Sequence, residues 1–483
     1  PSPSPVPFTS PSGRQNRASP SPSVGTTGSP SPITQLTIAA ITITPPRPTA
    51  GDPITFTADI HGPDPHTWSW TLQPINGPTQ RTSDQPTLHD TITTPGTYTV
   101  TLHIKNDTQT AEHHQNFTVG APPLTCGTTI TVDTTLTTDL TCPTTALTIQ
   151  GSSITLNLDG HTITGPGKTA AIAVSGDNNT ITNGTITKYA SAAKPDTTTP
   201  DLTLRSLKLR KSGAETDFVV SQPPGRARVT IEACDIDWDG AEISDSRHQV
   251  ASMEMTDSTV RNAIVGLYGA MEFVLRGNTF EDSKLRGDQL SGAALTGNTF
   301  IRSPVTLGRD YTRPTEIADN TFTGAETALS ISESSGLNIT GNTFDDNGVG
   351  MKITDFWLTG RENVSHVQAN HFHNNKVAGI LVRSSLRQSY PLVLTITGNW
   401  LDHNGYAYAG TVDGQGKAVD DGIHIERLST PPKPNEHAVL LAGNRTSGNA
   451  DRGIEADSDS VDNGGDNTSS GDENGCYPET MCE

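Results

Sequence analysis

The chain has 483 residues, with 52 acidic and 32 basic side chains and a formal net charge of -20. This charge disfavours nucleic acid and anionic lipid surfaces as partners, because both are polyanions. Glycine (45) and proline (34) are frequent, and no long 3.6-residue periodicity is present, so we expect an all-β protein. At this length, more than one structural unit is expected.

The ends and the hydropathy of the chain bear on where it acts. No stretch of about 18 consecutive apolar residues occurs, so we expect no membrane-spanning helix. The chain starts at Pro1 without a methionine or an apolar signal segment, which predicts a mature form or a fragment whose export signal was removed. We therefore expect an extracellular or cell-surface protein.

The first segment, residues 1–33, consists mainly of proline, serine, threonine and glycine. Such a composition favours polyproline II and buries too little apolar surface to offset the entropy of ordering. We predict a disordered linker.

Residues 34–120 contain short alternating strands separated by turns with proline and glycine, which predicts a small antiparallel β-sandwich. The run Thr94-Pro95-Gly96-Thr97-Tyr98-Thr99-Val100-Thr101-Leu102 and the opening Ala50-Gly51-Asp52-Pro53-Ile54-Thr55-Phe56 resemble a PKD domain. The Trp70 strand departs from that family, because Thr71-Leu72-Gln73-Pro74 replaces the usual acidic-glycine turn. The resemblance implies a module of secreted proteins that acts as a spacer or, in the alternative, as a domain that contacts glycans or proteins; we expect the spacer role, because nothing in this segment marks a ligand pocket.

From residue 124 a repeat begins. Its clearest copies place Asn-Thr-Phe at Asn278, Asn298, Asn320 and Asn342, at steps of 20, 22 and 22 residues. Short strands recurring at a fixed step predict a solenoid in which like residues stack at about 4.8 Å. Asparagine suits a corner because it tolerates the left-handed conformation and its amide can bond to the amides above and below. We predict a parallel β-helix of about 12–13 coils over residues 124–483.

The first coils also resemble a known group. The segment from Cys126 to Cys142, followed by Leu156-Asn157-Leu158-Asp159-Gly160-His161-Thr162-Ile163, is similar to the opening of secreted bacterial proteins of the PbH1-repeat, pectate-lyase-like group. The resemblance implies a right-handed parallel β-helix, and the crossover rule agrees with that hand.

Five cysteines bear on the compartment. Cys126 and Cys142 bracket one short segment, Cys476 and Cys482 bracket the last few residues, and Cys234 stands alone. Two local disulfides would fit an oxidising compartment. The alternative is five free thiols in a reducing compartment.

Candidate site residues lie where the repeat becomes irregular. A second strand column follows the asparagines, and its outward positions gather Lys352, Arg383, His424 and Glu426 on three consecutive strands. These are the residue types that uronate lyases on this scaffold need, so we predict them as candidate catalytic residues. The alternative is that Arg383 and Glu426 form only a cross-strand ion pair and that Lys352 and His424 are ordinary solvated residues.

The corner steps of 28, 29 and 45 residues on the same coils mark inserted loops. These loops carry Trp357, Tyr390 and Tyr406, together with Asp420 and Asp421. Aromatic rings beside charged groups suit sugar recognition, so we predict these five residues as substrate-binding. Asp420-Asp421-Gly422 also resembles the paired carboxylates of pectin-cleaving glycoside hydrolases, although the other motifs of those enzymes are missing.

Metal and cofactor signals are weak in the sequence. Residues 457–464 have carboxylates at calcium-loop intervals, but Val461 occupies a ligand position, which favours a simple turn. The remaining histidines, including His113 and His114, show no ligand partners in sequence. We predict no metal and no cofactor.

The resulting hypothesis is an exported, monomeric protein whose β-helix binds, and in a wider form of the hypothesis also processes, an extracellular or cell-wall polysaccharide or cell-surface glycan. Two alternatives stay open. One is a polysaccharide lyase or glycoside hydrolase, and the other is a non-catalytic surface adhesion or structural protein.

Overall fold

The structure, a computed structural model, describes residues 35–75, 77–196, 201–211, 228–240, 252–268, 272–288, 292–308, 314–354, 364–383, 393–407, 410–427, 438–457 and 459–483. The predicted linker at residues 1–33 lies outside this range. Contacts divide the chain into two compact units, with the boundary between Pro122 and Pro123.

The first unit is an antiparallel β-sandwich of two sheets. One sheet has the order β1-β2-β5 and the other β4-β3-β6-β7. The strands are β1 Thr37–Thr44, β2 Pro53–His61, β3 Thr67–Pro74, β4 Arg81–Ser83, β5 Leu88–Thr91, β6 Gly96–Lys105 and β7 Thr110–Val119. Between the sheets, Phe56, Trp70 and Tyr98 are buried, and the Trp70 indole donates a hydrogen bond to the Gln85 carbonyl (3.0 Å).

Strand β7 of the sandwich does not show the alternation of apolar and polar residues that predicts a strand. β7 pairs with the whole length of β6, yet its residues are alternately exposed and half-buried until Val119. It is an edge strand whose residues are mostly threonine, histidine, glutamate and glutamine, so it lacks the apolar alternation of strands such as β3 and β6.

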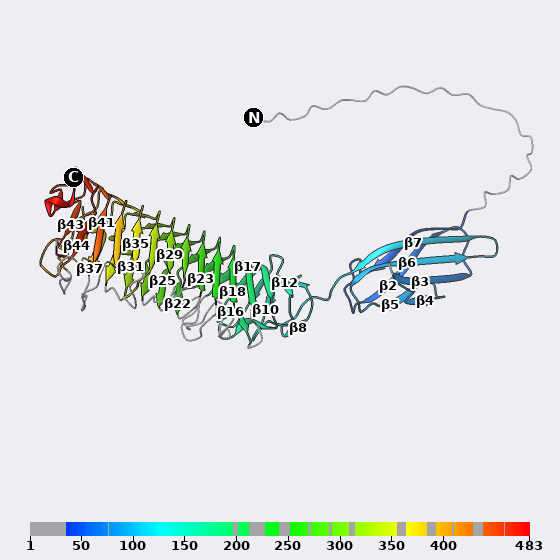
Figure 1. Cartoon of the computed structure of the whole chain (residues 1–483). Coiled ribbons are helices and arrows are strands. Elements are labelled where there is room, and N and C mark those ends of the chain that lie inside the picture. Colours follow the sequence, from blue (N-terminus) through cyan, green and yellow to red (C-terminus); the bar gives the residue numbers. More distant parts are fainter. Residues whose placement is uncertain are drawn as a thin grey trace, which may run out of the picture. The chain divides into compact units, whose positions relative to one another are not determined.

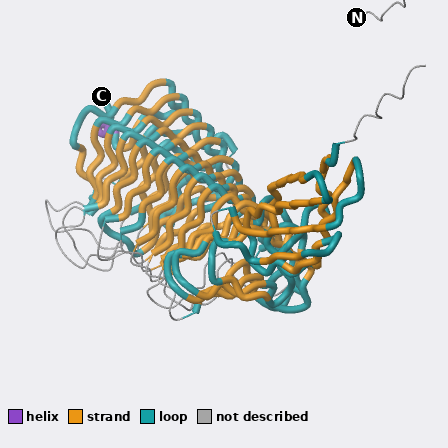
Figure 2. The backbone as a smooth tube through the Cα atoms, turned by 90° about the vertical axis from the view of Figure 1, so that its right-hand side faces the viewer, coloured by secondary structure: helices purple, strands orange, loops and turns teal. Residues whose placement is uncertain are grey.

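The second unit is a parallel β-solenoid, hereafter the β-helix, in which short strands stack from β8 toward the C-terminus (Figure 1). Figure 2 shows the strands as successive parallel layers. Among the described residues, a four-stranded sheet covers the first coils and comprises β8 Thr128–Ile130, β11 Leu147–Gln150, β14 Ala170–Ser175 and β16 Ser191–Pro195. A nine-stranded sheet follows, made of β22 Ile264–Tyr268, β25 Lys284–Asp288, β28 Val305–Gly308, β31 Thr327–Ser332, β34 Val349–Thr354, β37 Ala378–Arg383, β40 Ile423–Ile425, β43 Ile454–Ala456 and β46 Cys476–Tyr477.

The remaining described strands of the β-helix form one 26-stranded sheet that turns around the other sides of the coils. They are β9 Thr134–Thr135, β10 Leu140–Thr141, β12 Thr155–Asn157, β13 Thr162–Thr164, β15 Asn179–Thr187, β17 Asp201–Arg210, β18 Arg228–Glu232, β19 Asp235–Asp237, β20 Ser252–Thr256, β21 Thr259–Arg261, β23 Glu272–Arg276, β24 Thr279–Glu281, β26 Ala294–Thr296, β27 Thr299–Ile301, β29 Thr315–Ala318, β30 Thr321–Thr323, β32 Leu337–Thr340, β33 Thr343–Asp345, β35 Ser365–Gln368, β36 His371–His373, β38 Leu394–Thr397, β39 Trp400–Asp402, β41 Val439–Ala442, β42 Arg445–Ser447, β44 Val461–Asn463 and β45 Thr468–Ser470. A single 3-10 turn, η1 Glu479–Met481, is the helical element of the described chain.

The corner asparagines form the predicted ladder. The Asn320 side-chain amide donates to Oδ1 of Asn342 (2.9 Å), and Asn342 donates likewise to Asn370 (2.9 Å). Each is buried, so the ladder satisfies polar groups that water cannot reach. The left-handed residue is the one before the asparagine, such as Gly341 (φ +67°) or Asp319 (φ +55°), which corrects the expectation that the asparagine itself adopts this conformation. The buried asparagines of the ladder themselves have no positive φ.

A column of phenylalanines runs beside the ladder inside the coils. The centroids of Phe322 and Phe344 are 4.7 Å apart and their planes differ by 3°. This distance equals the strand spacing, so parallel stacking follows from the repeat itself. The other stacked pairs are Phe280 with Phe300, Phe300 with Phe322, and Phe344 with Phe372.

Both predicted disulfides are present, joining Cys126 to Cys142 and Cys476 to Cys482. Cys234 is free and buried. Within the described residues, no helix has the length and apolar character needed to cross a membrane.

Candidate functional site

One row of outward side chains crosses the C-terminal part of the nine-stranded sheet. Lys352 on β34 is in register with Leu381 on β37, Leu381 with His424 on β40, and His424 with Glu455 on β43. Lys352 and His424 therefore share a column but lie two coils, or roughly 10 Å, apart. The strand register agrees with the sequence prediction. The row is not an open surface, however, because Leu381 and His424 are buried.

A chain segment covers this row. Leu381 is 3% exposed although it points out of the β-helix, and it clusters with Val419, Val349 and Ala378. Val419 belongs to residues 410–427, the part of the longest insertion that leads into β40. A small second core thus forms outside the sheet, which explains why a leucine occupies an outward position.

His424 lies beneath the same segment, at 0% exposure. Its Nδ1 is 2.6 Å from Asp421 Oδ2 and 3.6 Å from Glu455 Oε2, while its Nε2 is 3.4 Å from Asp413 Oδ2. Lys417 approaches the other Glu455 oxygen at 2.8 Å. One imidazole and one ammonium group are thus packed among three buried carboxylates.

This burial changes the proton affinities of the cluster. Burial raises the pKa of Asp421 to about 6, even though the hydrogen bond with His424 opposes the shift. Burial alone would lower the pKa of His424, but its hydrogen bond to Asp421 and the nearby charges of Asp421, Glu455 and Asp413 raise it. Both pKa values are thus shifted upward, that of Asp421 mainly by burial and that of His424 by its acidic neighbours.

Arg383 and Glu426 form an ion pair between β37 and the end of β40. Arg383 also donates to the carbonyl of Val412 (3.1 Å). The side chains are 32% and 12% exposed, so the pair lies at the edge of the covering segment. Arg383 and Glu426 thus form the cross-strand ion pair that the sequence offered as an alternative to a catalytic role.

The exposed part of this region is a corner between sheets. Gly405 has φ +91°, and a Cβ there would meet the Asp420 carbonyl oxygen at 2.1 Å, so only glycine allows this close approach. The neighbouring Tyr406 is 66% exposed, and its hydroxyl donates to the Gly448 carbonyl (2.7 Å). The backbone amide of Asp451 donates to the Asp420 carbonyl (3.3 Å). These contacts fix the backbone that carries Tyr406 against that of Asp420, whose carboxylate lies within 4.8 Å of that of Asp451.

Tyr477 lies on β46, one coil beyond Glu455, and is 46% exposed. The Lys417 ammonium is 4.4 Å from its ring centroid, and the Arg452 guanidinium is 5.4 Å away. Arg452 is tied to the coil by a bond from its backbone amide to Asp421 (3.0 Å). We call the set of surface residues around this corner the corner surface, and it consists of Tyr406, Lys417, Asp420, Asp451, Arg452 and Tyr477.

The corner surface contains two of the predicted binding residues, Tyr406 and Asp420, while Asp421 lies behind them at 0% exposure. Trp357 and Tyr390 lie outside the described residues. The sequence reasoning missed Tyr477 and Arg452. Tyr477 could have been found by extending the register of the nine-stranded sheet, which places it one coil beyond Glu455.

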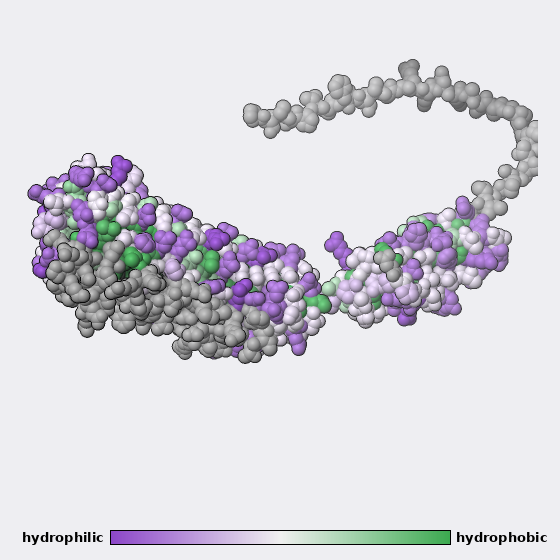
Figure 3. Space-filling view, in the orientation of Figure 1, coloured by the Kyte–Doolittle hydropathy of each residue, from purple (hydrophilic) through white to green (hydrophobic). Residues whose placement is uncertain are grey.

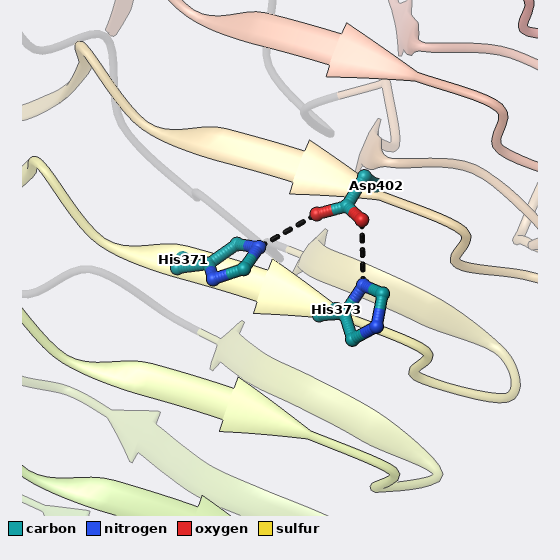
Figure 4. Close-up of side chains that lie close together, drawn as sticks. All are labelled: His371, His373 and Asp402. Atoms are coloured by element: carbon teal, nitrogen blue, oxygen red, sulfur yellow. Dashed lines mark hydrogen bonds and ion pairs between the residues drawn. The ribbon is translucent and has the colours of Figure 1, made fainter.

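A second constellation lies on the 26-stranded sheet. His371 and His373 on β36 both contact Asp402 at the end of β39, with Nε2 of His371 and Nδ1 of His373 each 2.6 Å from a carboxylate oxygen (Figure 4). Nδ1 of His403 is 3.0 Å from the same carboxylate. Burial would raise the pKa of Asp402, but hydrogen bonds from the three imidazoles hold it below its usual value. The fold thus brings together histidines for which the sequence showed no ligand partner.

Within the described part of the sandwich unit lie surface hollows of about 470 and 580 Å³. The first is lined by Trp68, His103 and Glu112, among others, and the second by Ile75 and Tyr98, among others.

Two family models match the chain. A model of the right handed beta helix region matches residues 216–464, and a PKD domain model matches residues 40–119. No curated protein matches the chain. Four chains of solved structures do, one of them from work described as "Structural basis for the promiscuous specificity of the carbohydrate-binding modules from the beta-sandwich super family".

That structure is 19% identical, and the match covers 19% of this chain and 37% of the other, with a TM-score of 0.17. A likeness of this size supports no structural or functional argument. The β-helix model, in contrast, spans just over half of the 483 residues. The chain therefore belongs to the right-handed β-helix family and carries a PKD domain ahead of the β-helix.

Proposed function

We propose that this protein binds an extracellular polysaccharide through the corner surface at the C-terminal coils of its β-helix. The observation that carries the proposal is the pair of exposed tyrosines, Tyr406 and Tyr477, on a rigid scaffold. The Tyr477 ring lies beside the cations of Lys417 and Arg452, and Tyr406 is held by its hydroxyl on the Gly448 carbonyl. Aromatic rings stack on the apolar faces of sugars, and carboxylates and cationic groups bond to sugar hydroxyls.

Burial favours binding over catalysis at the predicted catalytic residues. His424 and Asp421 are both 0% exposed, and a general acid or base must come within hydrogen-bond reach of its substrate. Arg383 and Glu426 already neutralise each other. The buried cluster is better suited to holding the covering segment on the coils than to contacting a polysaccharide.

The charges at the corner surface favour a neutral polysaccharide. Lys417 is paired with Glu455, and the cation of Arg452 lies near the acidic Asp451 and Asp420. The whole chain has a net charge of -20, which repels uronate polymers. Neutral sugars avoid this repulsion.

An extracellular location is part of the proposal. The two disulfides support it, because such bonds form and persist in oxidising compartments. The combination of a PKD domain with a disulfide-bearing β-helix is typical of extracellular proteins.

Glycoside hydrolysis at Asp420 is the second candidate. Burial raises the pKa of Asp420, and the charges of Asp451, Glu455 and Glu473 raise it further. A partly exposed carboxyl with a raised pKa is what a general acid in glycoside cleavage requires. This candidate predicts new reducing ends from the bound polysaccharide and their loss in Asp420→Asn.

The test is affinity electrophoresis of the full chain through gels that contain soluble neutral polysaccharides, with product analysis on each polysaccharide that retards it. Tyr406→Ala and Tyr477→Ala test the corner surface. Val132→Ala, which alters a 67% exposed residue near the other end of the β-helix, is the matched control. Trp68→Ala tests instead whether the hollow of the sandwich binds the polymer.

A further inference from the structure

The constellation of His371, His373 and Asp402 interrupts two rows that are otherwise unremarkable. On the preceding coils the first outward row of this face is occupied by Thr279, Thr299, Thr321 and Thr343. His371 follows Thr343 in register, and Trp400 follows His371. In the second outward row, His373 and Asp402 follow Asp345. Threonine is sufficient for the fold at the first position, so the histidines need another explanation.

The three side chains converge because strand geometry places them together. His371 and His373 are two residues apart on β36, so both point out of the same face. Asp402 is in register with His373 on the adjacent strand, and its two oxygens accept one hydrogen bond from each imidazole (Figure 4). The Asp402 side chain is 8% exposed, whereas the two imidazoles are 33% and 34% exposed.

The set also lacks a cationic side chain that would explain it as a salt bridge. In the described part of the chain, Asp402 forms ion pairs with the imidazoles of His371, His373 and His403. The His371 ring stacks on Trp400 with centroids 4.3 Å apart and planes 9° apart, which fixes its orientation. One carboxylate surrounded by three imidazoles is a set of side chains that commonly binds a metal ion.

We propose that His371, His373 and Asp402 bind one divalent transition-metal ion of the zinc class. Two imidazole nitrogens and one carboxylate oxygen are ligands that Zn²⁺ prefers, and three such ligands leave one position of a tetrahedral ion to be filled. The ligand atoms lie within 4.8 Å of one another. In a tetrahedral site with bonds of about 2.0 Å, ligand atoms are about 3.3 Å apart, so only small side-chain rotations are needed.

His403 is the candidate fourth ligand. It follows Asp402 at a corner with φ +56°, where other coils have residues such as Asp346 and Asn374. Its Nδ1 is 3.0 Å from Asp402 Oδ2, on the oxygen that also contacts His373. A histidine at this corner adds a third nitrogen within reach of the same ion.

The buried cluster on the opposite sheet is a poorer metal site. Asp421, His424 and Glu455 also lie within 4.8 Å of one another. However, Lys417 already neutralises Glu455, and His424 is bonded to Asp421 at 0% exposure. A cation would have to displace an ammonium group and enter a packed interior.

The experiment titrates the full chain, after treatment with a chelator, with Zn²⁺ by calorimetry and with Co²⁺ by visible absorption. We expect one high-affinity ion per chain and the d–d bands of a tetrahedral Co²⁺ site. Asp402→Asn and His373→Gln each lower the affinity by at least about tenfold. His366→Gln, which alters a histidine on β35 that bonds to Thr395, leaves the affinity unchanged.

A measurement on the wild-type chain avoids dependence on the folding of the variants. In a histidine-ring ¹H–¹⁵N spectrum, Zn²⁺ shifts the imidazole signals of His371 and His373 and leaves those of His366 in place. The proposal is overturned if no ion binds, if these imidazole signals do not move, or if His366→Gln weakens binding as much as His373→Gln does.

Discussion

Nδ1 of His424 lies 2.6 Å from Oδ2 of Asp421, three residues earlier in the chain, and both side chains are completely buried. The other oxygen of Asp421 accepts a hydrogen bond from the backbone amide of Arg452, which belongs to the next coil (3.0 Å). The pair therefore joins the end of the longest insertion to two successive coils and holds the base on which the corner surface is built.

Replacement of His424 by alanine should destabilise the β-helix strongly. It leaves the Asp421 carboxylate buried without its partner, and breaking a buried pair in this way costs about 3 kcal/mol or more. Urea unfolding at pH 7 measures the change. His161→Ala is the control, because His161 pairs with an exposed carboxylate, Asp139, and its loss should cost less than about 1 kcal/mol. Equal losses for the two variants would show that the buried pair has no special role.

The pH dependence of stability follows from the same pair. The pKa of Asp421 is raised from 3.8 to about 6 in the folded protein, so the folded state binds its proton more tightly than the unfolded chain does. Its contribution to stability is fully present below pH 3.8 and is lost as the pH rises through about 6. The raised pKa of His424 acts in the same direction at higher pH.

Comparison of wild type with Asp421→Asn isolates this term from the other carboxylates. Between pH 5 and pH 8, the free energy of unfolding of the wild type should fall more steeply than that of the variant. Denaturant unfolding at a series of pH values provides the measurement. Parallel curves for the two proteins would contradict the assignment.

Asn342→Ala should destabilise the central coils. The Asn342 amide donates to Asn370 and to the Ile317 carbonyl, and its Oδ1 accepts from the Asn320 backbone amide, all in a buried setting. Unsatisfied buried partners cost about 1–3 kcal/mol each, so a loss of several kcal/mol is expected. Hydrogen exchange localises the effect to the coils of β32 and β35. Thr343→Ala, on the outward row, is the matched control, and a loss as small as that of the control would refute the structural role of the ladder.

Most of the β-helix was predictable because residues that recur in the sequence repeat occupy equivalent positions on successive coils. Asn278 to Asn342 recur with Phe280 to Phe344, and in a solenoid like positions must lie above one another. The edge strand β7 was not predictable from alternation, because only one of its faces contacts the core and that face carries few large apolar residues. The left-handed conformation of the residue before each asparagine was also not predicted, because several residue types, such as Asp319 and Ala369, stand at this position.

The candidate site was predictable only in part. Column positions placed His424 two coils above Lys352, but an outward position does not reveal whether a loop covers it. Leu381 lies at the outward position between them, and an apolar residue there was the one hint in the sequence that a loop covers this face. The group around Asp402 was missed because its members are separated by about one coil in sequence. Counting three residues from Asn370 and from Asn399 would have aligned His373 with Asp402.

The most direct test of the account is the affinity of the full chain for neutral polysaccharides when both exposed tyrosines are removed. The account predicts that at least one neutral polysaccharide retards the wild-type chain. The affinity should fall tenfold or more, or about 1.4 kcal/mol, in Tyr406→Ala/Tyr477→Ala and remain unchanged in Val132→Ala. Retardation that is the same in the double variant and the wild type, or binding to none of the neutral polymers, would contradict it.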